Sequence, residues 1–103
     1  MDKIAMLTQI LEQNPNDAFA RYGLAMEYVS SGNAETALSE FTRLIELNPD
    51  YVPAYQMSAQ TLAKLGRDEE AIVRLRSGLE ASQRTNNHHA ASEMGALLDE
   101  LGG

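Results

Sequence analysis

Residues 14–49 read NPNDAFARYGLAMEYVSSGNAETALSEFTRLIELNP, so the segment begins and ends on the same Asn-Pro dipeptide. The two dipeptides lie 34 residues apart, and the same shift relates many other positions. Identical residues recur at Ala20/Ala54, Ala25/Ala59, Gly32/Gly66, Glu35/Glu69, Ala37/Ala71 and Glu46/Glu80. Apolar character is kept at Tyr28/Leu62, Leu38/Ile72, Phe41/Leu75 and Ile45/Leu79. A constant shift over most of the chain indicates an internal repeat.

Each 34-residue unit is predicted to form two helices. Gly32 and Gly66 stand where the first helices should end, because glycine adopts the left-handed C′ conformation without a Cβ penalty. Pro15 and Pro49 disfavour helix at the preceding residue and so separate one unit from the next. Helix starts are expected where Asp or Asn side chains can accept hydrogen bonds from the first free backbone N–H groups. These expected N-caps are Asn16-Asp17, Asn33, Asp50 and Asp68.

The repeat register also extends toward both ends of the chain. Residues 7–12 align with residues 41–46, which predicts that residues 3–13 are the second helix of a unit whose first helix is absent. Residues 87–101, NHHAASEMGALLDEL, are predicted to form a last amphipathic helix that covers the final apolar face. The second unit ends without proline, so its second helix is expected to be extended.

These residues closely resemble the tetratricopeptide repeat, whose period is 34 residues. The family's pair of small residues stands at Ala25/Ala37 and Ala59/Ala71, and its large residue between helices at Phe41 and Leu75; its closing proline is Pro15 and Pro49, and its early aromatic residue is Tyr55. The first unit departs from the pattern by placing Arg21, beside Tyr22, where an aromatic is usual.

The resemblance implies an all-α protein, a right-handed superhelical array of antiparallel helix pairs. It implies one domain over residues 1–103. Its parts would be an orphan second helix at 3–13, repeat 1 at 17–50, repeat 2 at 51–84 and a capping helix at 87–101.

Composition and charge narrow the classes of partner. The formal net charge is −7, with 15 acidic against eight basic residues. Such a surface repels phosphate backbones and anionic lipid, so nucleic acid and membranes are not expected as partners. The chain has no Cys, which excludes thiolate metal sites and a cysteine nucleophile. We expect a soluble, cytoplasmic protein, because the N-terminal segment lacks the uninterrupted apolar run of a signal peptide.

The resemblance also implies a function, namely binding a peptide or a helix of a partner protein in a concave groove lined by the first helix of each unit. Apolar periodicity does not separate groove from core for Phe19 and Tyr22, so both interpretations stay open there, whereas Met26 and Met57 are expected in the groove. The residues at groove positions are Phe19, Tyr22, Met26, Val29 and Ser30 in the first unit and Gln56, Met57, Gln60, Ala63 and Lys64 in the second, with Asn87, Ala90, Ala91 and Met94 as additions from the capping helix.

The family's carboxylate-binding clamp of Lys, Asn and Arg is not expected to operate. Its positions are occupied here by Tyr22, Met26, Met57, Asn87 and Ala91. None of these keeps the residue type that grips a C-terminal carboxylate. The sequence therefore predicts a groove that binds chiefly through apolar contact.

Catalysis, cofactors and metals are not expected. The sequence has no Gly-rich phosphate loop, nucleophile elbow or metal-binding His-Glu pattern. His88-His89, with Glu93 four residues after His89, could be read as metal ligands. No further ligand that would converge on the same metal ion is evident, so solvated histidines are the favoured interpretation. Arg67, Arg74 and Arg76 are expected to pair with acids at helical spacing.

A second hypothesis of a different class is a self-associating structural module. In it the apolar groove, or the unpaired N-terminal helix, faces another copy and gives a homodimer.

Overall fold

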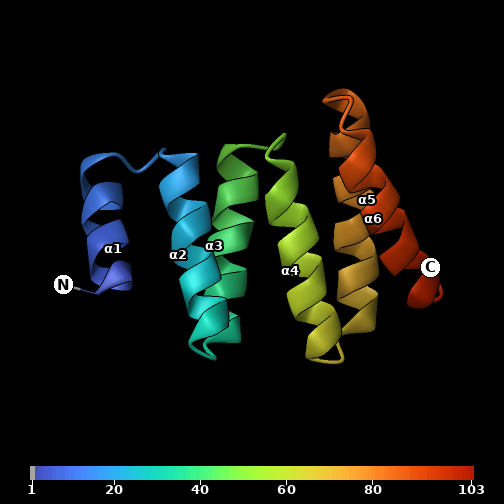
Figure 1. Ribbon diagram of the computed structural model, residues 1–103, viewed down its shortest axis with the longest axis horizontal. Coiled ribbons are helices and arrows are strands. Elements are labelled where there is room, and N and C mark those ends of the chain that lie inside the picture. Colours follow the sequence, from blue (N-terminus) through green and yellow to red (C-terminus); the bar gives the residue numbers. More distant parts are fainter. Residues whose placement is uncertain (1) are drawn as a thin grey trace. The chain divides into compact units, whose positions relative to one another are not determined.

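The computed structural model describes residues 2–103, and this part of the chain contains six α-helices and no strand (Figure 1). The helices are α1 Lys3–Gln13, α2 Ala18–Ser30, α3 Ala34–Leu47, α4 Val52–Lys64, α5 Asp68–Arg84 and α6 His88–Glu100. The all-α, tetratricopeptide-like helical repeat fold expected from the sequence is confirmed. The helices form two compact units: unit 1 ends at Asn48 and holds α1 to α3, and unit 2 runs from Pro49 to Gly103 and holds α4 to α6.

Three helices begin on a side chain that accepts a backbone hydrogen bond. Ala5 N donates to Asp2 Oδ1 at 2.8 Å, Ala20 N donates to Asp17 Oδ1 at 3.0 Å, and Ala90 N donates to Asn87 Oδ1 at 3.1 Å. Each bond satisfies one backbone N–H that has no partner within its helix. The prediction of Asp17 as an N-cap is therefore confirmed.

Two of the other predicted caps need correction. The N-caps of α4 and α5 are Tyr51 and Arg67, not Asp50 and Asp68. The Asp50 carboxylate is bound to Arg84 instead. Asp68 is the first residue of α5, where its negative charge interacts favourably with the positive end of the helix dipole. Asn33 is the N-cap of α3, as predicted, but makes no side-chain cap bond; its amide nitrogen donates to Ser31 Oγ at 3.0 Å.

The helix ends that glycine was expected to make are confirmed. Gly32 and Gly66 have φ of 82° and 76°, and the residue after each donates back to the carbonyl five positions earlier, at 2.8 Å in the first case and 2.9 Å in the second. α5 ends in the same way at Asn86, whose φ is 56°, with Asn87 N donating to Ser82 O at 2.8 Å. With no proline to stop it, α5 is 17 residues long against 14 for α3.

The core of unit 1 lies between three helices that Figure 1 shows running alternately up and down. Ala25 on α2, Ala37 on α3 and Phe41 on α3 are all fully buried. α1 packs on α2 through a smaller cluster consisting of Leu11, Ala20 and Leu24, with Ile4, Leu7 and Tyr28 packed against it.

Arg21, which replaces the family's usual aromatic residue, has a structural role in unit 1. Its Nη1 lies 2.7 Å from Glu40 Oε1 on α3, and its Nη2 donates to Pro15 O at 3.1 Å. The guanidinium therefore links the segment before α2 to the neighbouring helix α3.

The core of unit 2 has the same plan with a third helix added. Ala59 on α4 and Ala71 on α5 are fully buried, and Leu75 fills the position that Phe41 fills in unit 1. α6 packs on α5, and its Met94 is buried against Gly78.

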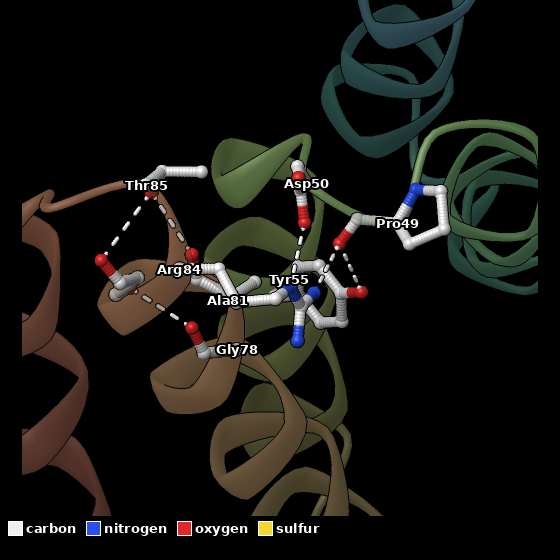
Figure 2. Close-up of polar contacts among 8 residues, drawn as sticks. Pro49, Asp50, Tyr55, Gly78, Ala81, Arg84 and Thr85 are labelled. Carbon is white, nitrogen blue, oxygen red and sulfur yellow. Dashed lines mark hydrogen bonds and ion pairs between the residues drawn. The ribbon is translucent and has the colours of Figure 1, made fainter.

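A cluster of polar contacts joins the start of α4 to the end of α5 in unit 2 (Figure 2). The Tyr55 hydroxyl donates to Pro49 O at 2.6 Å, and Arg84 Nη2 donates to the same carbonyl at 3.1 Å. Arg84 Nε also donates to Asp50 Oδ1 at 2.8 Å. The hydrogen bond to Asp50 raises the pKa of the Arg84 guanidinium above its ordinary value. The extra length of α5 therefore has a structural role, because Arg84 in its last turn binds Pro49 and Asp50 in the segment before α4.

Two glycines of unit 2 have opposite surroundings, and their substitutions should have opposite effects. A Cβ on Gly78 would lie 2.7 Å from both Met94 Sδ and Tyr55 Cβ, whereas a Cβ on Gly95 would meet no atom within 4 Å. We expect Gly78→Ala to lower the free energy of unfolding by about 1–3 kcal/mol through overpacking. Gly95→Ala should raise it by about 0.5–1 kcal/mol through helix propensity. Urea unfolding measures both, and a Gly78→Ala protein as stable as Gly95→Ala would contradict the close packing of α5.

Candidate functional site

Four of the predicted groove residues share one face of α2 in unit 1. Phe19, Tyr22, Met26 and Ser30 are spaced by three or four residues, which places them on the same side of a helix. None of the four is buried. We call these four residues the α2 surface.

The two aromatic residues of the α2 surface have different environments. The Phe19 side chain is 81% exposed, so the core interpretation of this residue is wrong. Tyr22 is half-buried, and its ring lies 6.2 Å from that of Phe41, centroid to centroid, at an interplanar angle of 58°. Tyr22 therefore rests on the core while Phe19 stands in solvent. Periodicity alone could not separate them, because both occupy the same helical face.

Both charged residues of α2, Arg21 and Glu27, form ion pairs with other helices of unit 1. Lys3 Nζ on α1 lies 3.4 Å from Glu27 Oε1 on α2, next to Met26. Arg21, between Phe19 and Tyr22, has its charge turned to Glu40, and its side chain is only 14% exposed. The apolar residues Phe19, Tyr22 and Met26, which we call the apolar strip, therefore have no exposed arginine on their own helix.

The predicted groove residues of unit 2 lie on α4. Gln56, Met57 and Gln60 are half-buried, and Lys64 is exposed. We call these four residues the α4 surface. Gln56 Nε2 donates to Glu93 Oε1 on α6 at 3.2 Å, so this surface is more polar than the α2 surface. The sequence did not reveal this link, since the two residues belong to different helices.

The additions expected from α6 are corrected in part. Ala90 and Met94 are buried in the core of unit 2, where Met94 lies against Gly78 of α5. The reason is that Gly78 leaves room for the Met94 side chain, whose sulfur fills the space that a Cβ would take. Asn87 is exposed but uses its side-chain oxygen as the N-cap of α6, and Ala91 is half-buried.

Arg67, the N-cap of α5, pairs with an acidic residue in the first turn of that helix. Arg67 donates to both carboxylate oxygens of Glu70, at 2.6 and 2.8 Å, and this hydrogen bonding lowers the pKa of Glu70. Burial lowers the pKa of Arg74. The pairing expected for Arg67 at helical spacing is confirmed.

The exposed His89 lies 3.3 Å from Glu93, from Nε2 to Oε1. Among residues 2–103 no group of three or more His, Asp or Glu side chains is arranged to hold a metal ion. No helix in the same range is long and apolar enough to cross a lipid bilayer.

One apolar pair was not singled out by sequence. Met6 and Ile10 on α1 are 47% and 40% exposed and lie four residues apart. Their spacing was a usable signal, because residues four apart share a face. What the sequence lacked was any indication of whether another helix covers that face.

Comparison with known proteins gives a family and a fold. The family model described as tetratricopeptide repeat matches residues 28–94. Tetratricopeptide repeat protein 13 of Homo sapiens is 33% identical over 94 residues, a match covering 84% of this chain and 11% of that protein. The chain spans only 11%, 16% and 20% of the first three curated relatives that it matches.

Two solved structures illustrate the likeness. A tetratricopeptide repeat domain protein from Salinibacter ruber is 32% identical with a TM-score of 0.80, covering 85% of this chain and 89% of that one. The TPR2B domain of yeast Sti1, solved in a complex with pHsp70, has a TM-score of 0.88 at 20% identity, covering 96% of this chain and 79% of that one. At 20% identity the second likeness concerns the fold alone.

The two phenylalanines of unit 1 should differ sharply in their contribution to stability. Phe41 is fully buried, and we expect Phe41→Ala to lower the free energy of unfolding by about 3–5 kcal/mol. Phe19 is mostly exposed, and we expect Phe19→Ser to change it by no more than about 0.5 kcal/mol. Both are measured by urea unfolding followed by circular dichroism. A large loss in Phe19→Ser would show that this ring belongs to the core.

Proposed function

This chain belongs to the tetratricopeptide repeat family, and we propose that it is a non-enzymatic interaction module that binds a peptide or a helix of a partner protein. Each unit supplies its own contact residues in this proposal, those of the α2 surface in unit 1 and those of the α4 surface in unit 2. It is supported by the fold, which yeast Sti1 uses in a complex with pHsp70.

The observation that carries the proposal is the exposed Phe19 ring. Exposed single apolar residues are common, but Phe19 shares its helical face with the half-buried Tyr22 and Met26. Aromatic side chains offer a large apolar area at a low cost in conformational entropy, and Met adapts to partners of different shape. A partner covering this face would remove the Phe19 ring from water and gain free energy from it.

The residues of both surfaces favour apolar contact over recognition of a terminal carboxylate. A carboxylate is held by Lys, Arg or Asn donors, and Tyr22, Met26 and Met57 stand at the matching positions of the family's clamp. We therefore propose an internal segment of the partner as the ligand. No cofactor or metal enters the proposal.

The proposal predicts that a charge at either methionine removes partner binding. The immobilised chain would be used to capture proteins from an extract of the cells that produce it, and a captured protein would be titrated by calorimetry. We expect Met26→Glu and Met57→Glu each to weaken binding by at least about tenfold, because burying an unpaired carboxylate in an apolar contact is costly.

Val73→Glu is the matched control, since Val73 is 65% exposed on α5 and belongs to neither surface. It should bind like the unaltered chain, and circular dichroism should show equal helicity in all variants. Full binding by both methionine variants would refute the proposed surfaces.

A homodimer is the second candidate function, and the exposed pair Met6 and Ile10 on α1 favours it. Here the α1 face would pack against the same face of another copy, as a two-fold symmetric interface requires. Light scattering over a hundredfold range of about 1–100 μM should then show the mass doubling, with Met6→Lys/Ile10→Lys remaining monomeric. A mass that stays monomeric over that range would exclude this candidate.

A further inference from the structure

We propose that the α2 surface binds a segment that combines apolar side chains with Lys or Arg, in preference to an acidic or uncharged segment. This inference rests on the proposed function and adds the chemical class of the partner. It is carried by the charges of unit 1 and by where its three basic residues point.

Unit 1 has an excess of negative charge. Up to Asn48 the chain holds seven acidic and three basic residues. Each base already lies near a carboxylate: Lys3 is 3.4 Å from Glu27, Arg21 is 2.7 Å from Glu40, and Arg43 is 3.9 Å from Glu46. An acidic partner would therefore compete with these carboxylates for every base of the unit, whereas a basic partner would be attracted by the net negative charge of the unit.

The acidic residues of unit 1 include two that precede Phe19 in the sequence, Glu12 and Asp17. Asp17 precedes Phe19 by two residues, and its carboxylate is anchored as the N-cap of α2. Glu12 is exposed near the end of α1, in the segment that leads into α2. Arg21 is the basic residue nearest to Phe19 in the sequence, but its guanidinium is bound to Glu40 and Pro15 and is largely covered. In this proposal Glu12 and Asp17 form an acidic rim beside Phe19, since the arginine nearest to it in the sequence is already bound.

In this complex, apolar contacts would determine the affinity and charged contacts the selectivity. Covering Phe19 and Met26 supplies the affinity, because it removes apolar area from water. The acidic rim supplies selectivity, since single exposed ion pairs add little affinity while charge complementarity speeds association and rejects like-charged partners. The preference should accordingly weaken as salt is added.

The test is selection from a phage-displayed random library of peptides about 12 residues long, enough to lie along α2 as a helix. The full chain, Phe19→Ser and Val73→Ser would be used as separate targets, and the selected pools sequenced. We expect pools from the full chain and from Val73→Ser to be enriched in apolar residues together with Lys and Arg, and depleted in Asp and Glu. Selection on Phe19→Ser should lose these sequences.

A peptide recovered by selection would then be synthesised and its binding followed by fluorescence anisotropy. We expect its Kd to rise at least about tenfold in Phe19→Ser, as for a central apolar contact. It should also rise several-fold between roughly 50 and 300 mM NaCl, as ion pairs at an exposed rim are screened.

The outcomes separate the two proposals. Phe19-dependent pools rich in acidic or uncharged peptides would overturn the charge preference and leave the α2 surface as a binding site. Pools that do not depend on Phe19 would overturn this inference, and the capture experiment with Met26→Glu and Met57→Glu would still decide the proposed function. Circular dichroism of Phe19→Ser excludes loss of fold as the cause.

Discussion

Close packing of paired helices through small residues is the constraint on which both units depend. Ala25 and Ala37 in unit 1, and Ala59 and Ala71 in unit 2, are all fully buried where their helices pack. No helix of such a pair can shield its apolar face alone, so each pair needs another helix against it. In unit 1 that helix is α1, and in unit 2 it is α6. The recurrence of alanine at a 34-residue shift is therefore a requirement of packing, not an accident of composition.

The two units meet this requirement differently at their third helix. In unit 2, Gly78 lets Met94 and Tyr55 approach α5 within the space of a missing Cβ. In unit 1, Gly23 on α2 faces Leu7 at an ordinary contact distance of 3.5 Å from its ideal Cβ to Leu7 Cδ1. α1 is therefore held less closely, by a small apolar cluster and the Lys3–Glu27 pair. The exposed apolar side chains of unit 1, Met6, Ile10 and Phe19, all lie on α1 or α2.

The division between core and surface gives the functional proposal its physical basis. Phe41 is buried between α2 and α3, and the Tyr22 ring of α2 packs against it. The two aromatic residues on this face of α2 therefore differ in exposure, since Tyr22 is half-buried and Phe19 is exposed. No contact within unit 1 removes the Phe19 ring from water. The chemistry of its neighbours then determines which partner is favoured, and those neighbours are acidic or have their positive charge directed into the unit.

The sequence alone was sufficient to predict the helices, their ends at Gly32 and Gly66 and the buried alanine pairs. These features follow from local backbone preferences and from the 34-residue repeat, both of which can be read from the order of the residues. It was not sufficient for the Arg84 contact with Asp50 and Pro49, the burial of Met94 or the exposure of Phe19. Each of these depends on which helix lies against which face, and helical periodicity defines a face without saying what covers it. Tertiary packing alone decided that Phe19 lies in solvent while Tyr22 rests on the core.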